Sequence, residues 1–295
     1  MDKLAPAQGP FFALPGHAVL ALEGRDAIAF AQAQCMSDVA ALADGEWHWS
    51  GWLSPKGRVQ ALFALLRVGP GTVWLLLPDG GAPALAEALG RFVFRAKVRI
   101  SVPAGVALCG AFAAPAEAAG GRAAVADGRV ELDMGDAAGP RTLRACSHCG
   151  ASADPEAEAR WKARDLAAGL PRAAPGALEA WTPQQLSLDR LRAYSVRKGC
   201  YPGQEIVART HFLGQAKRAL ALFGAPAAAA TGSPVVAGGR EIGAVVASAP
   251  AAGEAPGHGQ LLLAVLPADR DDAEAPPTVD GHPLAPLALR EGLAR

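Results

Sequence analysis

The alternation of apolar and polar positions in the first hundred residues predicts short strands interrupted by two helices. Strands are predicted at residues 17–22, 47–53, 59–67, 72–77 and 98–102. Helical spacing covers residues 26–34, where Asp26 can serve as the N-cap, and residues 82–92. Residues 54–57 (Ser-Pro-Lys-Gly) favour a tight turn, so the strands on either side should form a hairpin. Helices among hairpin-linked strands are typical of an α+β layer.

The middle of the chain has a weaker pattern because Ala and Gly are frequent there. Short strands are predicted at residues 106–109, 129–132 and 141–146. Residues 154–166 have helical spacing, and Gly169 can end that helix as a C-terminal cap. Residues 182–185 have the composition of a capping box: Thr182 is the N-cap, Pro183 takes the first helical position, and Gln185 follows three residues after the cap. This combination predicts a short helix that begins at Thr182.

The last eighty or so residues change to short β-rich pieces separated by Gly, Pro and Ala. Strands are predicted at residues 219–223, 234–236, 241–247 and 260–266. Such a series indicates a small β-barrel or sandwich. We therefore divide the chain into an α+β region at 1–215, with subdomains at about 1–103 and 104–215, and a small β domain at 216–295. The two α+β stretches are candidates for related halves, although no repeat of the usual solenoid length is visible.

Composition narrows the class of protein. The 28 Lys and Arg residues balance 28 Asp and Glu residues, so no global field attracts nucleic acid or an anionic bilayer. With 34 Gly and 24 Pro the chain is rich in turns but below the level of low-complexity sequences. No apolar run is long enough to span a membrane, and residues 1–6 do not resemble a signal peptide. We expect a cytoplasmic protein that binds no membrane.

The five cysteines are an odd number in a chain large enough to fold without staples, so a disulfide framework is not expected. Cys146 and Cys149 form a single Cys-x-x-Cys pair with His148 between them. A structural zinc would need a second pair of ligands, which the sequence does not offer nearby. No strand-to-helix pattern of the thioredoxin type surrounds the pair, so an exposed loop is favoured and a redox pair stays open.

The tryptophan and histidine residues indicate less about the function. Trp47, Trp49 and Trp52 lie in the predicted hairpin and could line a ligand pocket, but alternation in a strand more often places one face in a core. His17 and His48, like His258, have no Ser-His-Asp or paired-His arrangement near them in the sequence. A hydrolase therefore has no sequence support.

Residues 197–211 are the segment richest in reactive and shape-setting side chains. Gly199 and Gly203 allow backbone conformations closed to other residues, and Pro202 stiffens the bend between them. Cys200 should therefore be presented on a constrained loop. The alternative is that Cys200 is a small buried apolar residue, which is the common fate of a cysteine.

The groups next to Cys200 in the sequence should place positive charge around its thiol. Arg197 and Lys198 precede it, and a helix over residues 204–209 would add the positive end of its dipole, which together should favour thiolate over thiol. On that helix Glu205 and Arg209 are spaced to form an i, i+4 pair. By default such a pair is a solvated surface contact that contributes little.

Residues 198–209 resemble the Lys-Gly-Cys-Tyr-x-Gly-Gln-Glu signature of the YgfZ family, the folate-binding relatives of the glycine-cleavage T-protein that support iron-sulfur cluster assembly or repair. Further segments agree with the family in order: 20–38, 54–58, 169–171, 181–189 and 211–218. The resemblance covers roughly residues 17–266. The sequence departs from the family pattern at two positions. Ser187 stands where the family has Asn, and the family's Phe before the Pro-Gln pair is Trp181 here, separated from that pair by Thr182.

The resemblance implies an α+β, T-protein-like body of two related subdomains around a pocket for tetrahydrofolate or a one-carbon derivative, plus a C-terminal β-barrel. It places Cys200 at the pocket mouth as the catalytic candidate and implies no metal. The implied cofactor-binding residues are those of the motif and of the upstream segment: Lys198, Tyr201, Gln204, Glu205, Arg209, Gln184 and Asp189. Side-chain amides and carboxylates suit a pterin's amide edge, and Arg or Lys suits its glutamate tail.

The function implied is that of a tetrahydrofolate-binding accessory factor whose partners are folate and iron-sulfur client or assembly proteins. One alternative is an aminomethyltransferase of the glycine-cleavage type, although the T-protein has Asp where Cys200 stands, and a carboxylate and a thiol do different chemistry. Another is a role in tRNA modification, which would use a local basic patch: Lys56, Arg58, Arg197, Lys198, Arg209, Lys217 and Arg218. Whether the chain is an enzyme stays open.

Overall fold

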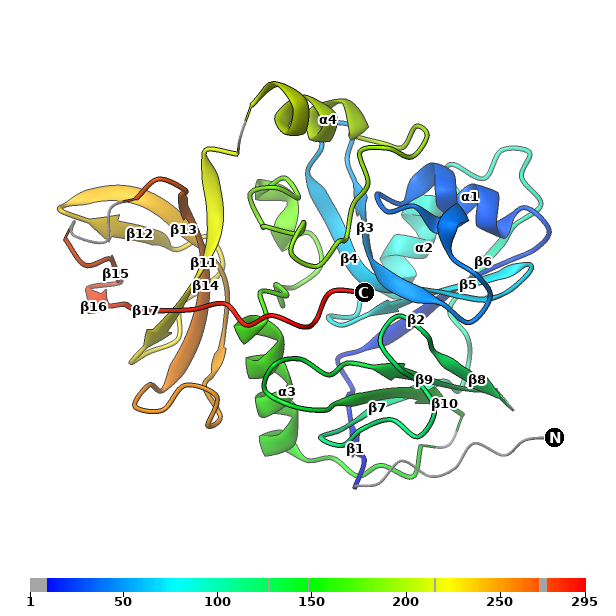
Figure 1. Cartoon of the computed structure of the whole chain (residues 1–295), viewed down its shortest axis with the longest axis horizontal. Helices are drawn as coiled ribbons and strands as arrows, with labels where there is room; N and C mark the ends of the chain where they lie inside the picture. Colours follow the sequence, from blue (N-terminus) through cyan, green and yellow to red (C-terminus); the bar gives the residue numbers. More distant parts are fainter. Residues whose placement is uncertain (1–9, 127, 148, 215, 271–274) are drawn as a thin grey trace.

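The described part of the chain folds into three antiparallel sheets and four α-helices (Figure 1). The structure is a computed structural model that describes residues 10–126, 128–147, 149–214, 216–270 and 275–295. The N-terminal segment compared with signal peptides and His148 of the Cys-x-x-Cys pair lie outside the described residues. Within the described ranges no helix is both long and apolar enough to cross a bilayer.

The first sheet is built as the hydrophobic pattern predicts. Its strand order is β3-β4-β5-β2-β6, with β2 (Ala18–Glu23), β3 (Trp47–Leu53), β4 (Val59–Gly69), β5 (Thr72–Leu77) and β6 (Arg99–Ser101). Helices α1 (Ala27–Gln34) and α2 (Ala82–Gly90) pack against it. A core of apolar side chains, including Phe30, Leu65 and Leu85, fills the space between helices and sheet. Burial of this kind is the main stabilising contribution to the layer.

The hairpin strand β3 is buried on both faces, so the expectation of one buried face was wrong. Trp47 and Trp49 lie in the large central core, with their ring centroids 5.7 Å apart, whereas Trp52 points into the core beneath the helices. Alternate residues of a strand face opposite sides, and here both sides are covered. All three indoles are core residues, as favoured over a ligand-lining role.

The second sheet has the order β1-β7-β10-β9-β8 and carries α3 on one side (Figure 1). Its elements are β1 (Phe12–Ala13), β7 (Ala107–Ala111), β8 (Ala124–Ala126), β9 (Arg129–Asp133), β10 (Thr142–Cys146) and α3 (Pro155–Ala167). The carboxylate of Asp154 accepts a hydrogen bond from the N–H of Ala157 at 2.9 Å and caps α3. Gly169 follows the helix with φ +77°, as a C-terminal cap requires.

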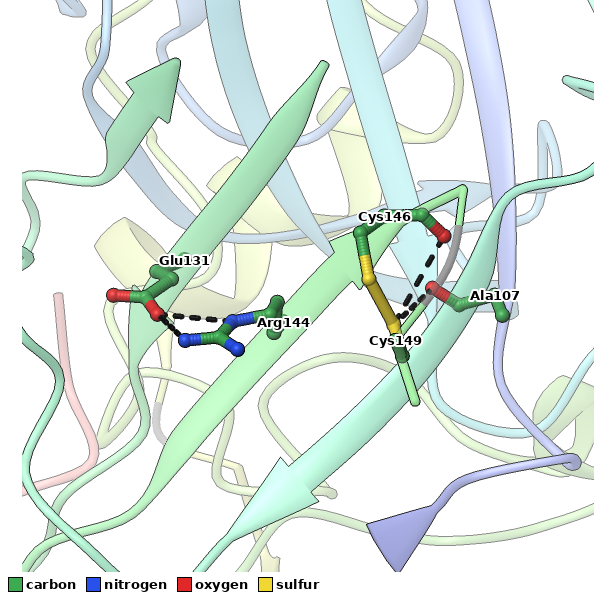
Figure 2. Close-up of a disulfide and its surroundings, with 5 residues drawn as sticks. All are labelled: Ala107, Glu131, Arg144, Cys146 and Cys149. Carbon is green, nitrogen blue, oxygen red and sulfur yellow. Dashed lines mark hydrogen bonds and ion pairs between the residues drawn. A yellow bond between two sulfur atoms is a disulfide. The ribbon is translucent and has the colours of Figure 1, made fainter. Parts of the chain in front are cut away.

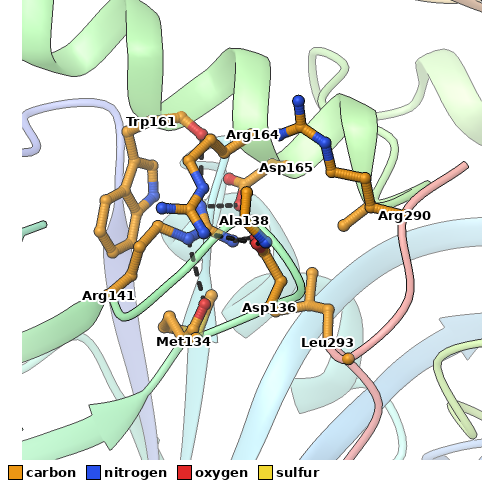
Figure 3. Close-up of polar contacts among 12 residues, drawn as sticks. Met134, Asp136, Ala138, Arg141, Trp161, Arg164, Asp165, Arg290 and Leu293 are labelled. Atoms are coloured by element: carbon orange, nitrogen blue, oxygen red, sulfur yellow. Dashed lines mark hydrogen bonds and ion pairs between the residues drawn. The ribbon is translucent and has the colours of Figure 1, made fainter. Parts of the chain in front are cut away.

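A chain of buried ion pairs joins the second sheet to the first. Figure 3 shows its part around Asp136, Arg141 and Asp165. Asp165 on α3 lies 2.7 Å from Arg141 on one side and 2.7 Å from Arg172 on the other. Arg172 also contacts Asp79 at 2.9 Å, at the end of β5, and Arg141 contacts Asp136 at 3.2 Å. Because each charge has an opposite partner, the cost of burying it is offset.

The third sheet, near the C-terminus, curls into a nearly closed barrel of seven strands, as the β-rich pattern predicts. The strand order is β16-β15-β12-β13-β14-β11-β17. The strands are β11 (Arg218–Ala225), β12 (Pro234–Ala237), β13 (Arg240–Pro250), β14 (Gln260–Pro267), β15 (Thr278–Val279), β16 (His282–Pro283) and β17 (Ala285–Leu287). The last residues leave the barrel, and the carbonyl oxygen of Leu293 accepts a 2.9 Å hydrogen bond from Trp49 Nε1 in the body. The division at 103/104 and 215/216 stays a prediction.

The helix predicted at Thr182 does not form. Both capping-box bonds are present, because Thr182 N–H donates to Gln185 Oε1 at 3.0 Å and Gln185 N–H donates to Thr182 Oγ1 at 3.4 Å. Ser187 (φ +49°) and Arg192 (φ +55°) then adopt left-handed backbone, which a right-handed helix cannot contain. The segment folds as consecutive turns that follow the short 3₁₀ turn Ala177–Ala180.

Asp26 occupies the N-cap position of α1, as predicted, but its side chain does not make the capping hydrogen bond to the helix. The carboxylate accepts from the backbone N–H of Lys97 at 2.6 Å and makes no bond to the first turn of the helix. The distant chain segment before β6 competes successfully for the carboxylate. A second 3₁₀ turn, Val39–Ala41, follows α1.

Candidate functional site

The loop that carries Cys200 is anchored by Lys198. The Lys198 ammonium donates hydrogen bonds to the carbonyl oxygens of Gln32, Cys35 (2.6 Å) and Ser37 (2.9 Å). These carbonyls belong to the end of α1 and the residues after it, where a cation is favoured by the helix dipole. Burial lowers the pKa of Lys198 to about 8. The ammonium is therefore directed at the C-terminus of α1.

Tyr201, Ser195 and Gln204 complete the loop. The Tyr201 hydroxyl donates to the Ser195 carbonyl oxygen at 3.0 Å, and Ser195 Oγ accepts from the backbone N–H groups of Arg197 and Lys198, each at 3.2 Å. Gln204 Nε2 donates to the Lys198 carbonyl oxygen at 3.1 Å. Tyr201 is buried, and burial raises the pKa of its hydroxyl. These side chains hold the shape of the loop from beneath.

The helix after the loop, α4 (Gln204–Leu213), begins against the β3–β4 turn. Gly203 has φ +76°, and a Cβ built on it would lie 2.6 Å from the Ser54 carbonyl oxygen. A Cβ on Gly57 would lie 2.8 Å from the Cβ of Ile206. Only glycine fits such close backbone approaches. Two segments that are far apart in the sequence and that carry the family resemblance are thus in direct contact.

Cys200 is exposed, which confirms that the loop presents the thiol. Asp189, Glu205 and Arg209 are also exposed. No ion pair joins Glu205 to Arg209 in the part of the chain that the structure describes, so the predicted i, i+4 pair does not form. Both side chains remain open to an external ligand.

Gln184 has a buried oxygen without a partner. Its Nε2 donates to the carbonyl oxygen of Val207 on α4 at 2.8 Å, whereas Oε1 accepts no hydrogen bond. The side chain is 9% exposed. An unsatisfied buried acceptor is costly, so a site that leaves one is suited to a ligand with an N–H or O–H donor.

A cavity of about 330 Å³ lies where the β3–β4 turn, the turn at residues 182–185 and α4 meet. It is lined by the side chains or backbone of Arg58, Thr182, Gln185, Thr210, Lys217 and Arg218. No Asp or Glu is among its described lining residues. Three of the seven cations named for a basic patch therefore gather here, which suits a ligand with carboxylate or phosphate groups. Sequence reasoning named these cations but could not place them around one cavity.

The arginines of this cavity are held in place. Arg58 Nη1 donates to the Ala180 carbonyl oxygen at 2.6 Å and lies 3.3 Å from Gln185 Oε1. Arg218 Nη1 donates to the Ile242 carbonyl oxygen at 2.7 Å. Because these contacts use neutral acceptors, the positive charges are not cancelled within the site.

Two other cavities of similar size fit a polar, anionic ligand less well. One, of about 360 Å³, lies on the barrel wall and is lined mainly by apolar groups such as Leu222 and Phe223. The other, of about 380 Å³, contains Asp79 and Arg172, whose charges are paired with each other. The cationic cavity beside α4 is the better candidate site.

The arrangement of the three sheets is that of a known transferase fold. The crystal structure of glycine cleavage system aminomethyltransferase T from Bartonella henselae superposes with a TM-score of 0.72, covering 96% of this chain and 86% of that one. The sequence identity is 14%, so the match shows the fold alone. The class of protein is therefore one with an aminomethyltransferase T fold, and the expected T-protein-like body with a C-terminal barrel is confirmed.

Curated relatives carry the assignment further. An uncharacterised protein of Haemophilus influenzae is 28% identical over 214 residues, which is 72% of each chain. The tRNA-modifying protein YgfZ of Edwardsiella ictaluri is 30% identical over 219 residues, 68% of this chain and 66% of that protein. The YgfZ of Escherichia coli O157:H7 is 28% identical over 225 residues, 70% and 69% of the two chains. No protein-family model matches the chain. The chain belongs to the YgfZ family, as the resemblance of its cysteine loop indicates.

Proposed function

We propose that the protein binds tetrahydrofolate, or a one-carbon derivative of it, and acts as an accessory factor in the assembly or repair of iron-sulfur clusters. Membership of the YgfZ family and the aminomethyltransferase T fold support the ligand class. The observation that carries the proposal is the cationic cavity lined by Arg58, Lys217 and Arg218.

The chemistry of the site fits a folate. A pterin presents ring N–H donors, and the polar groups of the cavity lining that can accept them belong to Thr182, Gln185 and Thr210, whereas Gln184 lies outside the described lining. A folate also ends in a glutamate with two carboxylates, for which Arg58 and Lys217 supply positive charge. The cavity volume of about 330 Å³ is within the range of small-molecule sites. When bound, tetrahydrofolate supplies a carrier for a one-carbon unit.

The residues of the cysteine loop divide into two groups in this proposal. Lys198, Tyr201 and Gln204 hold the loop through their hydrogen bonds. Glu205, Arg209 and the upstream Asp189 are exposed but, like Gln184, lie outside the described lining of the cavity, so in this proposal the ligand's acidic groups are held by Arg58, Lys217 and Arg218. Cys200 supplies the reactive thiol, since a thiol at an exposed, anchored position is accessible to a client protein.

Calorimetric titration of the purified protein with tetrahydrofolate tests the ligand. We expect saturable binding, and Lys217→Gln should weaken it because a cation is removed from the cavity. Lys97→Gln makes the same charge change at an exposed position outside the cavity and should bind like the wild type. An absence of heat with the wild-type protein would remove folate from the proposal.

The cellular role needs a separate test. Cys200→Ser should fold and bind tetrahydrofolate like the wild type, but should not restore the activity of an iron-sulfur enzyme in cells that lack the protein. Full restoration by Cys200→Ser would show that the thiol has no part in the function. If Cys200→Ser does not restore the activity, the denaturant unfolding curve of the purified variant shows whether the variant failed to fold.

A role in tRNA modification is the second candidate, because curated relatives are named tRNA-modifying proteins. The same cations, Arg58, Lys217 and Arg218, would then contact phosphates. This role predicts that tRNA binding weakens steeply as salt is raised, with a log–log slope set by the number of contacted phosphates. Weak binding that is insensitive to salt would remove it. An aminomethyltransferase activity has the fold as its support and is tested by assaying aminomethyl transfer from its carrier protein to tetrahydrofolate.

A further inference from the structure

Three cysteines converge on one face of the second sheet, away from the cavity and from Cys200. Cys109 on β7 is paired directly with Arg144 on β10, and Cys146 lies two residues further along β10. Residues two apart on a strand share a face, so Cys109 and Cys146 are diagonal neighbours across the pair. The chain then turns back and places Cys149 Sγ 3.4 Å from the Ala107 carbonyl oxygen on β7 (Figure 2).

The three sulfur atoms form a compact group. The Sγ atoms of Cys109, Cys146 and Cys149 all lie within 4.8 Å of one another. Cys146 and Cys149 are joined as a disulfide, with Cα atoms 5.6 Å apart, and Cys109 is a free thiol beside it. Cys109 and Cys146 are buried, whereas Cys149 is half-buried and leaves the group reachable from solvent.

The surroundings are not those of cysteines used as apolar filler. Arg144 and Glu131 occupy the same face and form an ion pair there (Figure 2). The Arg144 guanidinium also lies 3.9 Å from the ring centroid of Phe11, which covers it. The charge of Arg144, directly opposite Cys109 in the strand pairing, is balanced by Glu131, and burial raises the pKa of the Cys109 thiol to about 11, so the positive charge that stabilises thiolates here has to come from a bound cation.

We propose that, once the disulfide is reduced, Cys109, Cys146 and Cys149 form a three-thiolate site for a thiophilic d¹⁰ cation such as Zn²⁺. Thiolates are the ligands that such cations prefer, with metal–sulfur distances of about 2.3 Å. Tetrahedral coordination at that distance places sulfurs roughly 3.8 Å apart. After reduction the two former disulfide sulfurs separate from a bonding distance of about 2 Å to that spacing, and Cys109 Sγ closes on them from within 4.8 Å; rotation of the Cys side chains supplies both movements.

The chemistry balances with a dithiol as the named reductant. The dithiol gives two electrons and two protons to the Cys146–Cys149 disulfide and leaves as its own disulfide, so that three thiols face one another. The cation then displaces the three thiol protons to solvent. Three thiolates and a divalent ion carry one net negative charge, which lies beside the Arg144–Glu131 ion pair. In the reverse direction an external disulfide accepts two electrons from Cys146 and Cys149 and two protons from solvent and leaves as its dithiol; the Cys146–Cys149 disulfide re-forms, Cys109 takes up a proton, and the ion is released.

A fourth ligand is not available within 4.8 Å among the Cys, His, Asp and Glu side chains that the structure describes. Zinc sites with three protein ligands keep an exchangeable fourth position, whereas structural sites are closed by four. With the three described cysteines as ligands, the fourth position is left to water or another donor, and reduction of the disulfide is what makes two of the three thiolates available.

Metal titration of the full chain tests the proposal. The protein is reduced with a dithiol, freed of reductant without air, and titrated with Co²⁺ as a spectroscopic probe and then with Zn²⁺ in competition. We expect one equivalent per chain, with thiolate-to-cobalt charge-transfer absorption that Zn²⁺ abolishes, and no binding before reduction. Cys109→Ser and Cys149→Ser should each lose stoichiometric binding.

The remaining cysteines provide matched controls. Cys200→Ser, at an exposed position, and Cys35→Ser, at a buried one, should both keep one equivalent. Binding by Cys109→Ser equal to that of the wild type would assign the metal to the Cys-x-x-Cys pair alone and overturn the three-ligand site. Loss of binding in Cys200→Ser, or no binding by the reduced wild type, would also overturn it. Cys109→Ala, which avoids burying a hydroxyl, covers the case in which the serine variant does not fold.

Discussion

Gly203 and Gly57 meet backbone to backbone, so that a Cβ atom on Gly203 would lie 2.7 Å from the Gly57 Cα atom. This contact couples the β3–β4 turn to the start of α4. The turn precedes Arg58, which lines the cationic cavity, and α4 follows the loop that presents Cys200. The two ends of the candidate site are therefore positioned by one contact that tolerates no side chain.

Gly203→Ala should release this coupling. The new methyl group would lie 2.6 Å from the Ser54 carbonyl oxygen at a residue with φ +76°, so clash and backbone strain act together. We expect a loss of roughly 1–3 kcal/mol in the free energy of unfolding, measured by denaturant titration. Gly199→Ala is the matched control on the same loop, because its Cβ would meet nothing within 4 Å. Equal stability of the two variants would show that the contact is not held in solution.

Lys198→Met should destabilise the protein through α1. The substitution leaves the carbonyl oxygens of Cys35 and Ser37 without their buried donor, and hydrogen bonds to a charged group are worth about 1.5–3 kcal/mol. Thermal and denaturant unfolding measure the loss. Arg197→Met, at the exposed neighbouring residue, should change stability little.

Measuring tetrahydrofolate binding by folded Lys198→Met separates the two roles of this lysine. If the ammonium only binds the carbonyl oxygens at the end of α1, the affinity for tetrahydrofolate should be unchanged. Unchanged stability with lost affinity would instead make Lys198 a ligand contact.

The hydrophobic pattern predicted an element correctly where the neighbouring residues also favoured the turn or cap that the element needs. The hairpin around residues 54–57 and the helix predicted over residues 154–166, with Gly169 after its end, formed as predicted, because each depends on neighbours in the sequence. The helix at Thr182 did not form although its capping bonds did, since Ser187 further along takes left-handed backbone. Capping chemistry can start a helix but does not fix the residues that follow.

Long-range relationships were outside the reach of the pattern. Cys109 neighbours Cys146 only through the pairing of β7 with β10, so the sequence suggested a Cys-x-x-Cys pair in an exposed loop, and burial of Cys146 in a disulfide corrects this. Arg58 and Lys217 meet at one cavity through three segments of the chain. The exposure of Cys200 was predictable because two glycines and a proline define its loop locally.

Asp165→Asn should be strongly destabilising, because it breaks two buried ion pairs at once. Asp165 neutralises Arg141 and Arg172, each at 2.7 Å, and both guanidinium groups are buried. Removing one member of such a pair leaves an uncompensated buried charge and costs roughly 3–5 kcal/mol in the free energy of unfolding. Glu87→Gln, which breaks the exposed Glu87–Arg91 pair, should cost less than about 1 kcal/mol. A loss for Asp165→Asn as small as that would show that water reaches the buried charges.

The stability of the protein should fall as the pH is lowered from about 6.5 towards 4, with His48 as one cause. Burial lowers the pKa of His48 from 6.5 to about 4, and the Ser37 hydroxyl lies 2.7 Å from its Nε2. The unfolded state then binds a proton that the folded state does not, so the stabilisation is complete above pH 6.5 and is lost as the pH falls through this window. The shift corresponds to a loss on the order of 3 kcal/mol. Burial also lowers the pKa of His17, which adds to the effect.

The test compares unfolding free energies at pH 7 and pH 4.5 for three proteins. His48→Gln keeps a polar group near Ser37 but cannot titrate, so the decrease in stability between the two pH values should be smaller than in the wild type. His282→Gln, at an exposed position, should keep the wild-type decrease. An identical decrease in all three proteins would assign the acid sensitivity to other groups, such as His17.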